Sequence, residues 1–426
     1  METMATSGSP QTAVISTGAL FDEIPALANL DPADPYAAYA QLFGAPLVAA
    51  GGSVVVVTRY HECYELLRHP HVMNRRDTSP AFRGLTASFM HMMDPPEHTR
   101  IRSIVNKALT RRSVEALKPW LEREVHRLLD RPPSAVGRYD VITELAYPLP
   151  LNAICQMLDV PMADRGAITG WSRSITYGSD LLAGRRSTID QHEFRTAIGA
   201  FRRYIQKLTE ERRRAPKDDL LSRLILAEET GDRLTDREIT WTAIGLLVTG
   251  HETTVSLIAH GAIALSRHPE MVDRVATDED FADAFIEEIL RYDSPVQAAV
   301  RIAAEDLRVD TVDVRADSAL LLILGAANRD PDQFADPDSF DVDRRNNRTH
   351  LAFGGGPHFC PGAALSRLET RLALMALAQR FVNPRLDADG VRYRKGTMMR
   401  TPTVVDFEVD DIRPRQNVGS AGGAPR

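Results

Sequence analysis

The sequence predicts a mainly α-helical protein with small β-sheets beside the helices. Helical periodicity dominates the chain, whereas β-branched runs are confined to Val54–Thr58 and to an alternating segment at Leu307–Val314. With 426 residues, 43% of them hydrophobic, the chain is long enough to bury a large core. Because residues 21–411 contain no low-complexity linker and no fixed-period repeat, we expect one domain there, with flexible ends at residues 1–20 and 412–426.

Composition and charge exclude several classes of protein. The 51 Lys and Arg residues against 58 Asp and Glu give a net charge of −7, which does not favour a nucleic-acid partner. The three cysteines, Cys63, Cys155 and Cys360, do not form a disulfide framework or a CxxC pair. The longest apolar runs, such as residues 319–327, are half the roughly 18 residues that a membrane span needs, and the N-terminus lacks signal-peptide features. We therefore expect a cytoplasmic protein without a membrane segment.

Boundary signals predict three prominent helices. The first follows the segment DPPE at residues 94–97, with Asp94 as its N-cap and a proline at its first position. The second begins at the capping-box pattern Thr235-x-x-Glu238 and continues to Ser266. This second helix has some 31 residues and is about 47 Å long, so we expect it to cross the whole protein. The third helix is predicted at residues 363–381.

A glycine-rich segment, FGGGPHFCPG at residues 353–362, directly precedes the third helix. Its successive glycines allow a tight turn and a close approach to a flat, bulky group. Cys360 stands just before a helix N-terminus, where free N–H groups and the helix dipole favour a thiolate. From residue type alone, Cys360 could equally be a small buried hydrophobe. A phosphate loop would need a Gly-Lys-Ser/Thr ending, and a zinc site would need more ligands than His358 and Cys360.

This segment resembles the haem-ligand signature of the cytochrome P-450 family, F-G-x-G-x-H-x-C-x-G, at every fixed position. The resemblance implies the P-450 fold, with haem b held between the long central helix and the cysteine loop. It implies that Cys360 is the axial thiolate ligand of the iron, a ligand that favours O–O cleavage. It also places Phe353 at the cofactor and gives His358 a hydrogen bond to a haem propionate.

Further cationic residues match propionate-binding positions of the family. His98 and Arg102 are four residues apart on the helix after Asp94, so they share a face. Considered alone they could be an ordinary basic helix face, although arginine suits a carboxylate well. The stretch MDPPEHTRIRS resembles the family's C-helix, and Arg301 matches another propionate-binding arginine. Together with His358, these residues would suit two propionates, because buried carboxylates must be paired.

Glu288 and Arg291 are spaced for an ion pair on one helix face. Such a pair on the surface contributes only tenths of a kcal/mol, and that alternative is open on spacing alone. The pair resembles the family's E-x-x-R motif, and the segment FADPDSFDVDR at residues 334–344 resembles the meander that follows. The resemblance implies structural roles for Glu288, Arg291 and Arg344 as one Glu–Arg–Arg cluster.

The long helix contains a polar interruption, GHETT at residues 250–254, within an apolar stretch. Glycine and polar residues in a central helix lower stability, although threonine hydroxyls that bond to their own helix would be a simple explanation. The segment resembles the family's oxygen-activation motif. That resemblance implies a local opening of the helix at Gly250, and proton guidance by Glu252 and Thr253. Thr249 stands where the family usually has alanine.

Substrate-contacting residues can be placed only by analogy with the family. They are mostly apolar and either small or flexible, which indicates a roomy pocket for a hydrophobic polyketide, macrolide or terpenoid. The candidates are Phe82, Leu85, Phe89, Met90, Ala243, Leu246, Val248, Thr249, Val296, Gln297, Ala298, Met398 and Met399.

The resemblance covers roughly residues 20–410 and includes no fused flavin or iron–sulfur module. It implies a monooxygenase that inserts one atom of O2 into its substrate, with hydroxylation as the expected outcome. Electrons would come from NAD(P)H through a separate ferredoxin and ferredoxin reductase. Epoxidation, oxidative coupling or desaturation by the same haem are alternatives, as is a haem sensor without turnover, although a sensor needs no acid–threonine pair. A basic patch would suit an acidic ferredoxin, unless it is merely a solvated face; its members are Lys107, Arg111, Arg112, Arg345 and Arg348.

Overall fold

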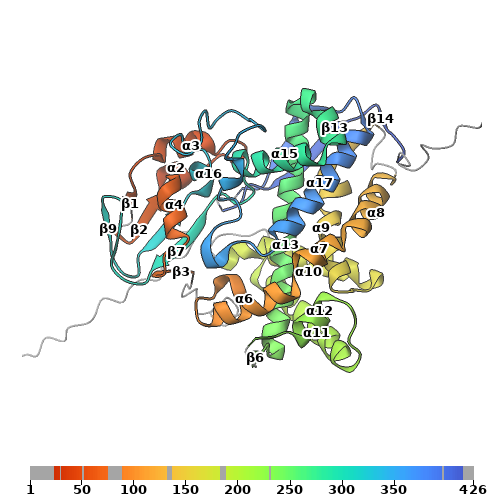
Figure 1. The fold of residues 1–426 in the computed structure, drawn as a ribbon, viewed down its shortest axis with the longest axis horizontal. Coiled ribbons are helices and arrows are strands. Elements are labelled where there is room, and N and C mark those ends of the chain that lie inside the picture. The colour runs from red at the N-terminus through yellow and green to blue at the C-terminus, as the bar shows by residue number, and fades with distance from the viewer. Residues whose placement is uncertain are drawn as a thin grey trace, which may run out of the picture.

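The structure is a computed structural model that describes residues 24–28, 30–49, 52–74, 89–131, 137–182, 189–229, 232–395 and 398–415. Within these ranges the protein is mainly helical, with a five-stranded sheet at one side of the helical body (Figure 1). This arrangement confirms the predicted fold class. No helix in the described part of the chain has the length and apolar character needed to cross a membrane.

The helical body surrounds one long helix, α13 (Asp236–Arg267), which runs through its middle (Figure 1). The helix α13 packs against α9, α10, α11, α15 and α17. The other helices of the body are α6 (Glu97–Ala108), α7 (Arg111–Glu115), α8 (Lys118–Leu129), α9 (Pro148–Met157), α10 (Arg165–Leu182), α11 (Gln191–Arg214), α12 (Leu220–Leu226), α14 (Val272–Thr277), α15 (Glu279–Tyr292) and α17 (Ala363–Arg380).

The predicted boundaries of α13 are confirmed. The Thr235 hydroxyl accepts a hydrogen bond from the Glu238 N–H at 3.2 Å, and the Glu238 carboxylate accepts one from the Thr235 N–H at 2.8 Å. These two bonds satisfy donors that every helix leaves free at its first turn. The helix ends before His268, as the following proline requires.

The predicted N-cap of the helix after the DPPE segment is wrong. The helix α6 begins at Glu97 with Pro96 at its N-cap position, and no side chain caps it. Pro95 precedes another proline, and a residue in that position is excluded from helical geometry by steric clash. The Asp94 carboxylate instead accepts a hydrogen bond from the Asn74 N–H at 2.8 Å.

The five-stranded sheet is buried on both faces, which explains the uninterrupted apolar run that predicts it. Val54 and Val56 of strand β2 belong to one hydrophobic cluster, whereas Val55 and Val57 belong to another on the opposite face. Four short helices accompany this sheet: α2 (Pro25–Ala28), α3 (Tyr36–Leu42), α4 (Tyr60–Leu66) and α16 (Leu324–Ala327). The strand order is β1 (Leu47–Ala49), β2 (Val54–Val57), β10 (Ala319–Leu322), β7 (Ala299–Ala303) and β3 (Val72–Met73), with only β2 and β10 parallel.

Smaller sheets complete the fold. The predicted alternating segment forms a hairpin, in which Asp310 takes a positive φ of 50° at the turn. Residues 412 and 413, which the sequence assigns to a flexible tail, are structured, because Ile412 pairs with Phe381 and the buried Arg380 donates to the Arg413 carbonyl at 2.6 Å; residues 416–426 lie outside the described residues. The remaining strands are β4 (Arg138–Asp140), β5 (Glu228–Glu229), β6 (Asp232–Arg233), β8 (Leu307–Val309), β9 (Val312–Val314), β11 (Phe381–Val382), β12 (Arg385–Tyr393), β13 (Pro402–Glu408) and β14 (Asp411–Ile412).

Candidate functional site

The glycine loop before α17 is held in one conformation. Gly354 and Gly356 have φ values of 70° and 60°, which side-chain-bearing residues rarely adopt. A Cβ on Gly356 would lie 2.5 Å from the Leu67 carbonyl oxygen, so this position also excludes a side chain. The Cys360 N–H donates to the Phe353 carbonyl at 3.0 Å and closes the loop. Cys360 is therefore presented at a fixed place just before α17.

The Cys360 thiol has a raised pKa, because it is buried. The N–H groups of Gly362 and Ala363 and the guanidinium groups of Arg102 and Arg367 act in the opposite direction but do not outweigh burial. The sequence predicts that the helix terminus favours a thiolate, and the structure shows that burial is the larger effect. Coordination to a metal deprotonates a thiol outright, so a metal ligand is a role that this environment suits.

Two of the predicted cationic residues are in direct contact beside this loop. The rings of His98 on α6 and His358 on the loop have centroids 3.9 Å apart. Both ring nitrogens of His98 are buried without a hydrogen-bond partner. The pKa of His358 is lowered to about 3 by burial and by the neighbouring charges of His98, Arg301 and Arg102. The structure thus brings all four predicted cationic residues to one place.

This cluster is suited to a bound anion. The pKa of Arg301 is lowered to about 10 by burial, and Asp94 acts against this decrease. Arg102 donates from Nη2 to the Phe359 carbonyl, on the cysteine loop itself. Arg102 and Arg301 are partly buried cations, so a ligand with carboxylates would neutralise their charges and would also accept a hydrogen bond from a His98 ring nitrogen, which has no partner among the described residues. The two propionates of a haem meet this requirement next to Cys360.

In the middle of α13, the most exposed side chains lie on one face of the helix. Thr249 is exposed and Thr253 half-buried in this structure. The Thr249 hydroxyl donates to the Gly245 carbonyl at 2.8 Å, and the Thr253 hydroxyl to the Thr249 carbonyl at 3.0 Å. The helix is continuous through this region, so the expected local opening does not interrupt it. The simple explanation, threonines bonded to their own helix, describes what is observed.

The family resemblance places Gly250 at the haem. In the structure, helix packing gives a different reason for a glycine at this position. A Cβ at this position would lie 2.9 Å from Cδ1 of Ile154 on α9. The absent side chain of Gly250 therefore points to α9, and the glycine allows the two helices to approach closely.

Glu252 is buried, and its pKa is raised by burial. Its Oε2 lies 3.3 Å from Nη1 of Arg394, and the charges of Arg394 and Arg173 partly counteract the effect of burial. Sequence reasoning did not find Arg394. This residue directly follows β12, in the segment RYRK at residues 392–395, which matches no motif, and only the tertiary structure brings it to α13.

The substrate candidates separate into three groups. Phe82 and Leu85 lie outside the described residues. The ring of Phe89 packs on Trp241 with centroids 5.2 Å apart, and lies 3.4 Å from the Cβ position of Gly245. The half-buried or exposed candidates are Met90, Leu246, Val248, Thr249, Val296, Met398 and Met399.

Three further substrate candidates, like Phe89, are buried in the protein core. Ala243 has no exposed surface and belongs to the main hydrophobic core, because it lies off the α13 face that Thr249 and Thr253 share. Ala298 is 1% exposed and packs in a second core beneath the sheet. Gln297 is also buried, and its Nε2 donates to the Ser294 carbonyl at 2.6 Å.

Glu288 and Arg291 form a fully buried, bidentate ion pair, with N–O distances of 2.7 and 2.9 Å. The alternative of a surface pair is therefore wrong. Nε of Arg344 lies 3.8 Å from the Glu288 carboxylate, so the three residues do form one cluster. The remaining donors of Arg291 bond to the carbonyls of Asn328, Pro337 and Ser339, which anchors the segment before the cysteine loop.

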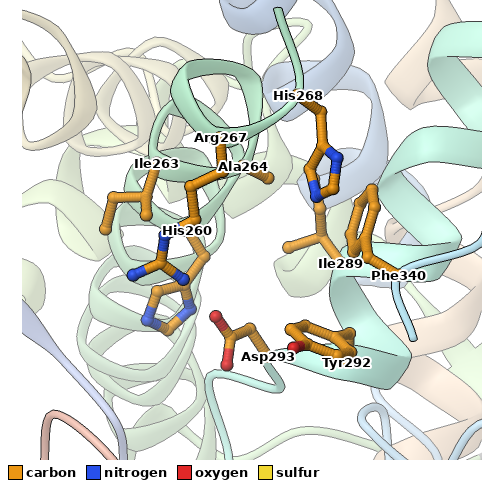
Figure 2. Close-up of a pocket in the computed structure, with 9 residues that line it drawn as sticks. All are labelled: His260, Ile263, Ala264, Arg267, His268, Ile289, Tyr292, Asp293 and Phe340. Carbon is orange, nitrogen blue, oxygen red and sulfur yellow. The ribbon is translucent and has the colours of Figure 1, made fainter. Parts of the chain in front are cut away.

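A small cavity lies elsewhere, between the C-terminal half of α13 and the end of α15 (Figure 2). None of the predicted site residues lines it. Asp293 at its edge is bonded to Arg400 at 2.9 Å and to the Tyr36 hydroxyl at 2.9 Å. Arg400 also bonds Nε2 of His260 at 3.2 Å. These contacts join α13, α15 and the N-terminal segment of the described chain.

Comparison with known proteins agrees with this geometry. The sequence model of the cytochrome P450 family matches residues 186–398. The monooxygenase PikC of Streptomyces venezuelae is 37% identical over 367 residues, which are 83% of this chain and 86% of PikC. The 6-deoxyerythronolide B hydroxylase of Saccharopolyspora erythraea is 39% identical, over 75% of this chain and 77% of the hydroxylase. The chain belongs to the cytochrome P450 family.

Solved structures of the family share the fold. CYP164A2 of Mycobacterium smegmatis superimposes with a TM-score of 0.80 at 38% identity, covering 92% of this chain and 98% of that structure. CYP109Q5 of Chondromyces apiculatus gives a TM-score of 0.81 at 30% identity, covering 90% and 97%. The protein is a bacterial-type haem-thiolate monooxygenase, which binds a cysteine-ligated haem, uses O2 and receives electrons from NAD(P)H through redox partners.

Proposed function

We propose that this monooxygenase hydroxylates a hydrophobic natural product of the polyketide, macrolide or terpenoid type. The proposal is supported by the similarity to PikC and to 6-deoxyerythronolide B hydroxylase. It is also supported by the apolar side chains of Phe89, Met90 and Leu246 around the exposed face of α13. The observation that carries the proposal is the glycine loop, which presents Cys360 next to His98, Arg102, Arg301 and His358.

We assign the haem contacts to residues that the cysteine loop and its neighbours supply. Cys360 would hold the haem iron through its thiolate, Phe353 would lie at the cofactor, and the carbonyl of Phe353 accepts a hydrogen bond from the Cys360 N–H. The cations that pair with the propionates are His98, Arg102, Arg301 and His358. When bound, the haem supplies the activation of O2 at its iron. The unpartnered nitrogens of His98 are the observation that most directly calls for such an anion.

Glu252 and Thr253 are our candidates for proton delivery. The raised pKa of Glu252 brings its titration closer to neutrality, where an acid can both give and regain a proton. The Thr253 hydroxyl directs its hydrogen to the Thr249 carbonyl, so its oxygen can accept a hydrogen bond from a neighbouring donor. Both side chains lie on the segment of α13 that the family resemblance assigns to oxygen activation.

We further propose a ferredoxin as the electron donor. The five predicted patch residues are all exposed. Lys107 ends α6, Arg111 and Arg112 begin α7, and α7 packs against α17, which follows Cys360. Phe359 on the cysteine loop is 44% exposed and offers an apolar contact. The three cysteines are free, which suits the reducing cytoplasm where such a donor would act.

The test is the absorption spectrum of the dithionite-reduced protein under carbon monoxide. We expect a strongly red-shifted Soret band, which reports a thiolate-ligated haem. Cys360→Ala should remove this band, whereas Cys155→Ala, a matched change at a buried free cysteine, should leave it unchanged. A red-shifted band in Cys360→Ala would refute the ligand assignment. Macrolactones, terpenoids and fatty acids are then screened for a substrate-induced spin shift, and a response confined to fatty acids would refute the substrate class.

A further inference from the structure

The carboxylate of Glu252 faces a cation from a distant part of the chain, at ion-pair distance but without hydrogen-bond geometry at Oε2. Arg394 directly follows β12, and its N–H donates to the Thr401 carbonyl at 2.9 Å. Its Nη1 lies 3.3 Å from Oε2 of Glu252 on α13. The side chain of Arg394 is 23% exposed and that of Glu252 is 10% exposed. In this ion pair the carboxylate is almost fully buried, whereas the guanidinium is partly exposed to solvent.

The Arg394 guanidinium has a further neighbour on α10. The ring centroid of Tyr177 lies 5.5 Å from Cζ of Arg394 and 5.4 Å from Cζ of Arg173. The planar guanidinium of an arginine is itself pre-organised, so it has less conformational entropy to lose when it binds a carboxylate.

The groups that act on Glu252 are two cations and one phenol, and a second phenol, Tyr177, lies beside both cations. Arg394 comes from the C-terminal hairpin, and Arg173 and Tyr177 come from α10. Tyr147, just before α9, has a buried hydroxyl without a partner, and its pKa is raised to about 12 by burial and by the charge of Glu252. His251, adjacent on α13, is neutral near pH 7, because burial lowers its pKa to about 4. Among the described groups that act on Glu252, the only charged ones are thus the two arginines.

We propose that Arg394 is a positioning residue for proton delivery, which orients the Glu252 carboxylate toward the C-terminal hairpin and stabilises its ionised form. This inference rests on the proposed role of Glu252. A buried carboxylate without a counter-ion stays protonated, because desolvation disfavours its charged form. With Arg394 in place, Glu252 can give its proton to the relay proposed at the Thr253 hydroxyl and take up another from the solvent that reaches the guanidinium. Substitution of Arg394 should therefore change the pKa of Glu252, while the helix α13 keeps its structure.

The experiment is an infrared titration of the Glu252 carboxyl band in the haem-loaded protein, assigned by difference against Glu252→Gln. Arg394→Gln should raise the pKa of Glu252 by roughly one unit or more, since an opposite charge within about 4–6 Å shifts a carboxyl by about 1–3 units. Arg394→Lys should restore part of this shift. Arg392→Gln removes the same charge from an exposed position of the same strand and should give the wild-type titration.

The outcomes separate this inference from the proposed function. An unchanged Glu252 titration in Arg394→Gln overturns the inference, whatever the activity of the variant. If Arg394→Gln does not fold, the Arg394→Lys variant is used instead. A Glu252 titration in Arg394→Lys that is identical to that of the wild type would then refute a specific guanidinium contact. If Glu252→Gln leaves the fraction of NAD(P)H electrons recovered as hydrogen peroxide unchanged, the proton role of Glu252 fails. Arg394 would then be only a structural counter-ion of Glu252, even if the infrared shift is observed.

Discussion

At the scale of single residues, the threonines of α13 show why residue type alone does not decide a role. The hydroxyls of Thr249, Thr253 and Thr254 each donate to the carbonyl four residues earlier, at 2.8, 3.0 and 3.2 Å. Their surroundings differ, because Thr254 is buried and bonds Ser366 of α17 at 3.1 Å, whereas Thr253 is half-buried on the face that Thr249 shares. The same residue type therefore has a packing role at one position and is available to a ligand at the next.

This difference predicts the effect of two matched substitutions. Thr253→Ala should leave the haem spectrum and the thermal stability nearly unchanged, since it removes one bond to the own helix. Product formation should fall by on the order of 100-fold, as expected for the loss of a proton-transfer group, with electrons diverted to hydrogen peroxide. Thr254→Ala should instead lower the melting temperature and keep the coupling. Peroxide and NAD(P)H assays on both variants measure this, and full coupling in Thr253→Ala would exclude Thr253 from proton delivery.

At the scale of elements, buried ion pairs join segments that are far apart in the sequence. The pair of Glu288 and Arg291 on α15 bonds the segment of residues 328–344, which leads into the cysteine loop. The pair of Arg400 and Asp293 connects the loop between β12 and β13 to the end of α15, beside the cavity in Figure 2. Each pair leaves an uncompensated charge if one partner is removed, so these contacts specify the arrangement of elements as well as its stability.

Arg291→Ala should therefore be strongly destabilising. Breaking a buried pair by removing one partner costs about 3–5 kcal/mol, and Arg291 additionally loses three bonds to carbonyl groups. A suitable control is Arg308→Ala, because the ion pair of Arg308 with Asp313 is exposed and such pairs contribute about 0–1 kcal/mol. Urea unfolding of both variants gives the comparison. A loss below 1 kcal/mol for Arg291→Ala would contradict a structural role for the pair.

At the scale of the whole molecule, charge is distributed unevenly. The chain carries a net charge of −7, yet the exposed residues at the end of α6 and the start of α7 are basic. A local patch of one sign steers a partner of the opposite sign, and added salt weakens this steering. Electron transfer from an acidic ferredoxin should therefore slow as ionic strength rises.

Charge reversal within the patch tests this expectation. Arg112→Glu should lower the rate of haem reduction by a ferredoxin by roughly tenfold at low salt, and the difference should shrink at high salt. Arg202→Glu makes the same charge change at an exposed position on α11 and should have little effect. Stopped-flow reduction at two salt concentrations measures both. Equal effects of the two variants would show that net charge, and not this patch, governs docking.

Much of the site was predictable from the sequence because its signals are local. The glycines before Cys360, the capping box at Thr235 and the spacing of His98 and Arg102 each involve a few neighbouring residues, and backbone sterics or helical geometry decides what they form. The long helix and the mainly helical fold follow from the same local rules. The roles of Phe353, His358 and Cys360 were predicted from a ten-residue signature, because a loop that must fit one cofactor tolerates few sequences.

The tertiary structure decided what depends on which elements pack together. It placed Arg394 beside Glu252, buried Ala243 and Ala298 in two cores and gave Gly250 its contact with α9. It also showed that burial has a larger effect than the helix terminus on the pKa of the Cys360 thiol. Such features arise from contacts between segments that are remote in the sequence. Their energies depend on burial and on neighbouring charges, and both exist only once the chain has folded.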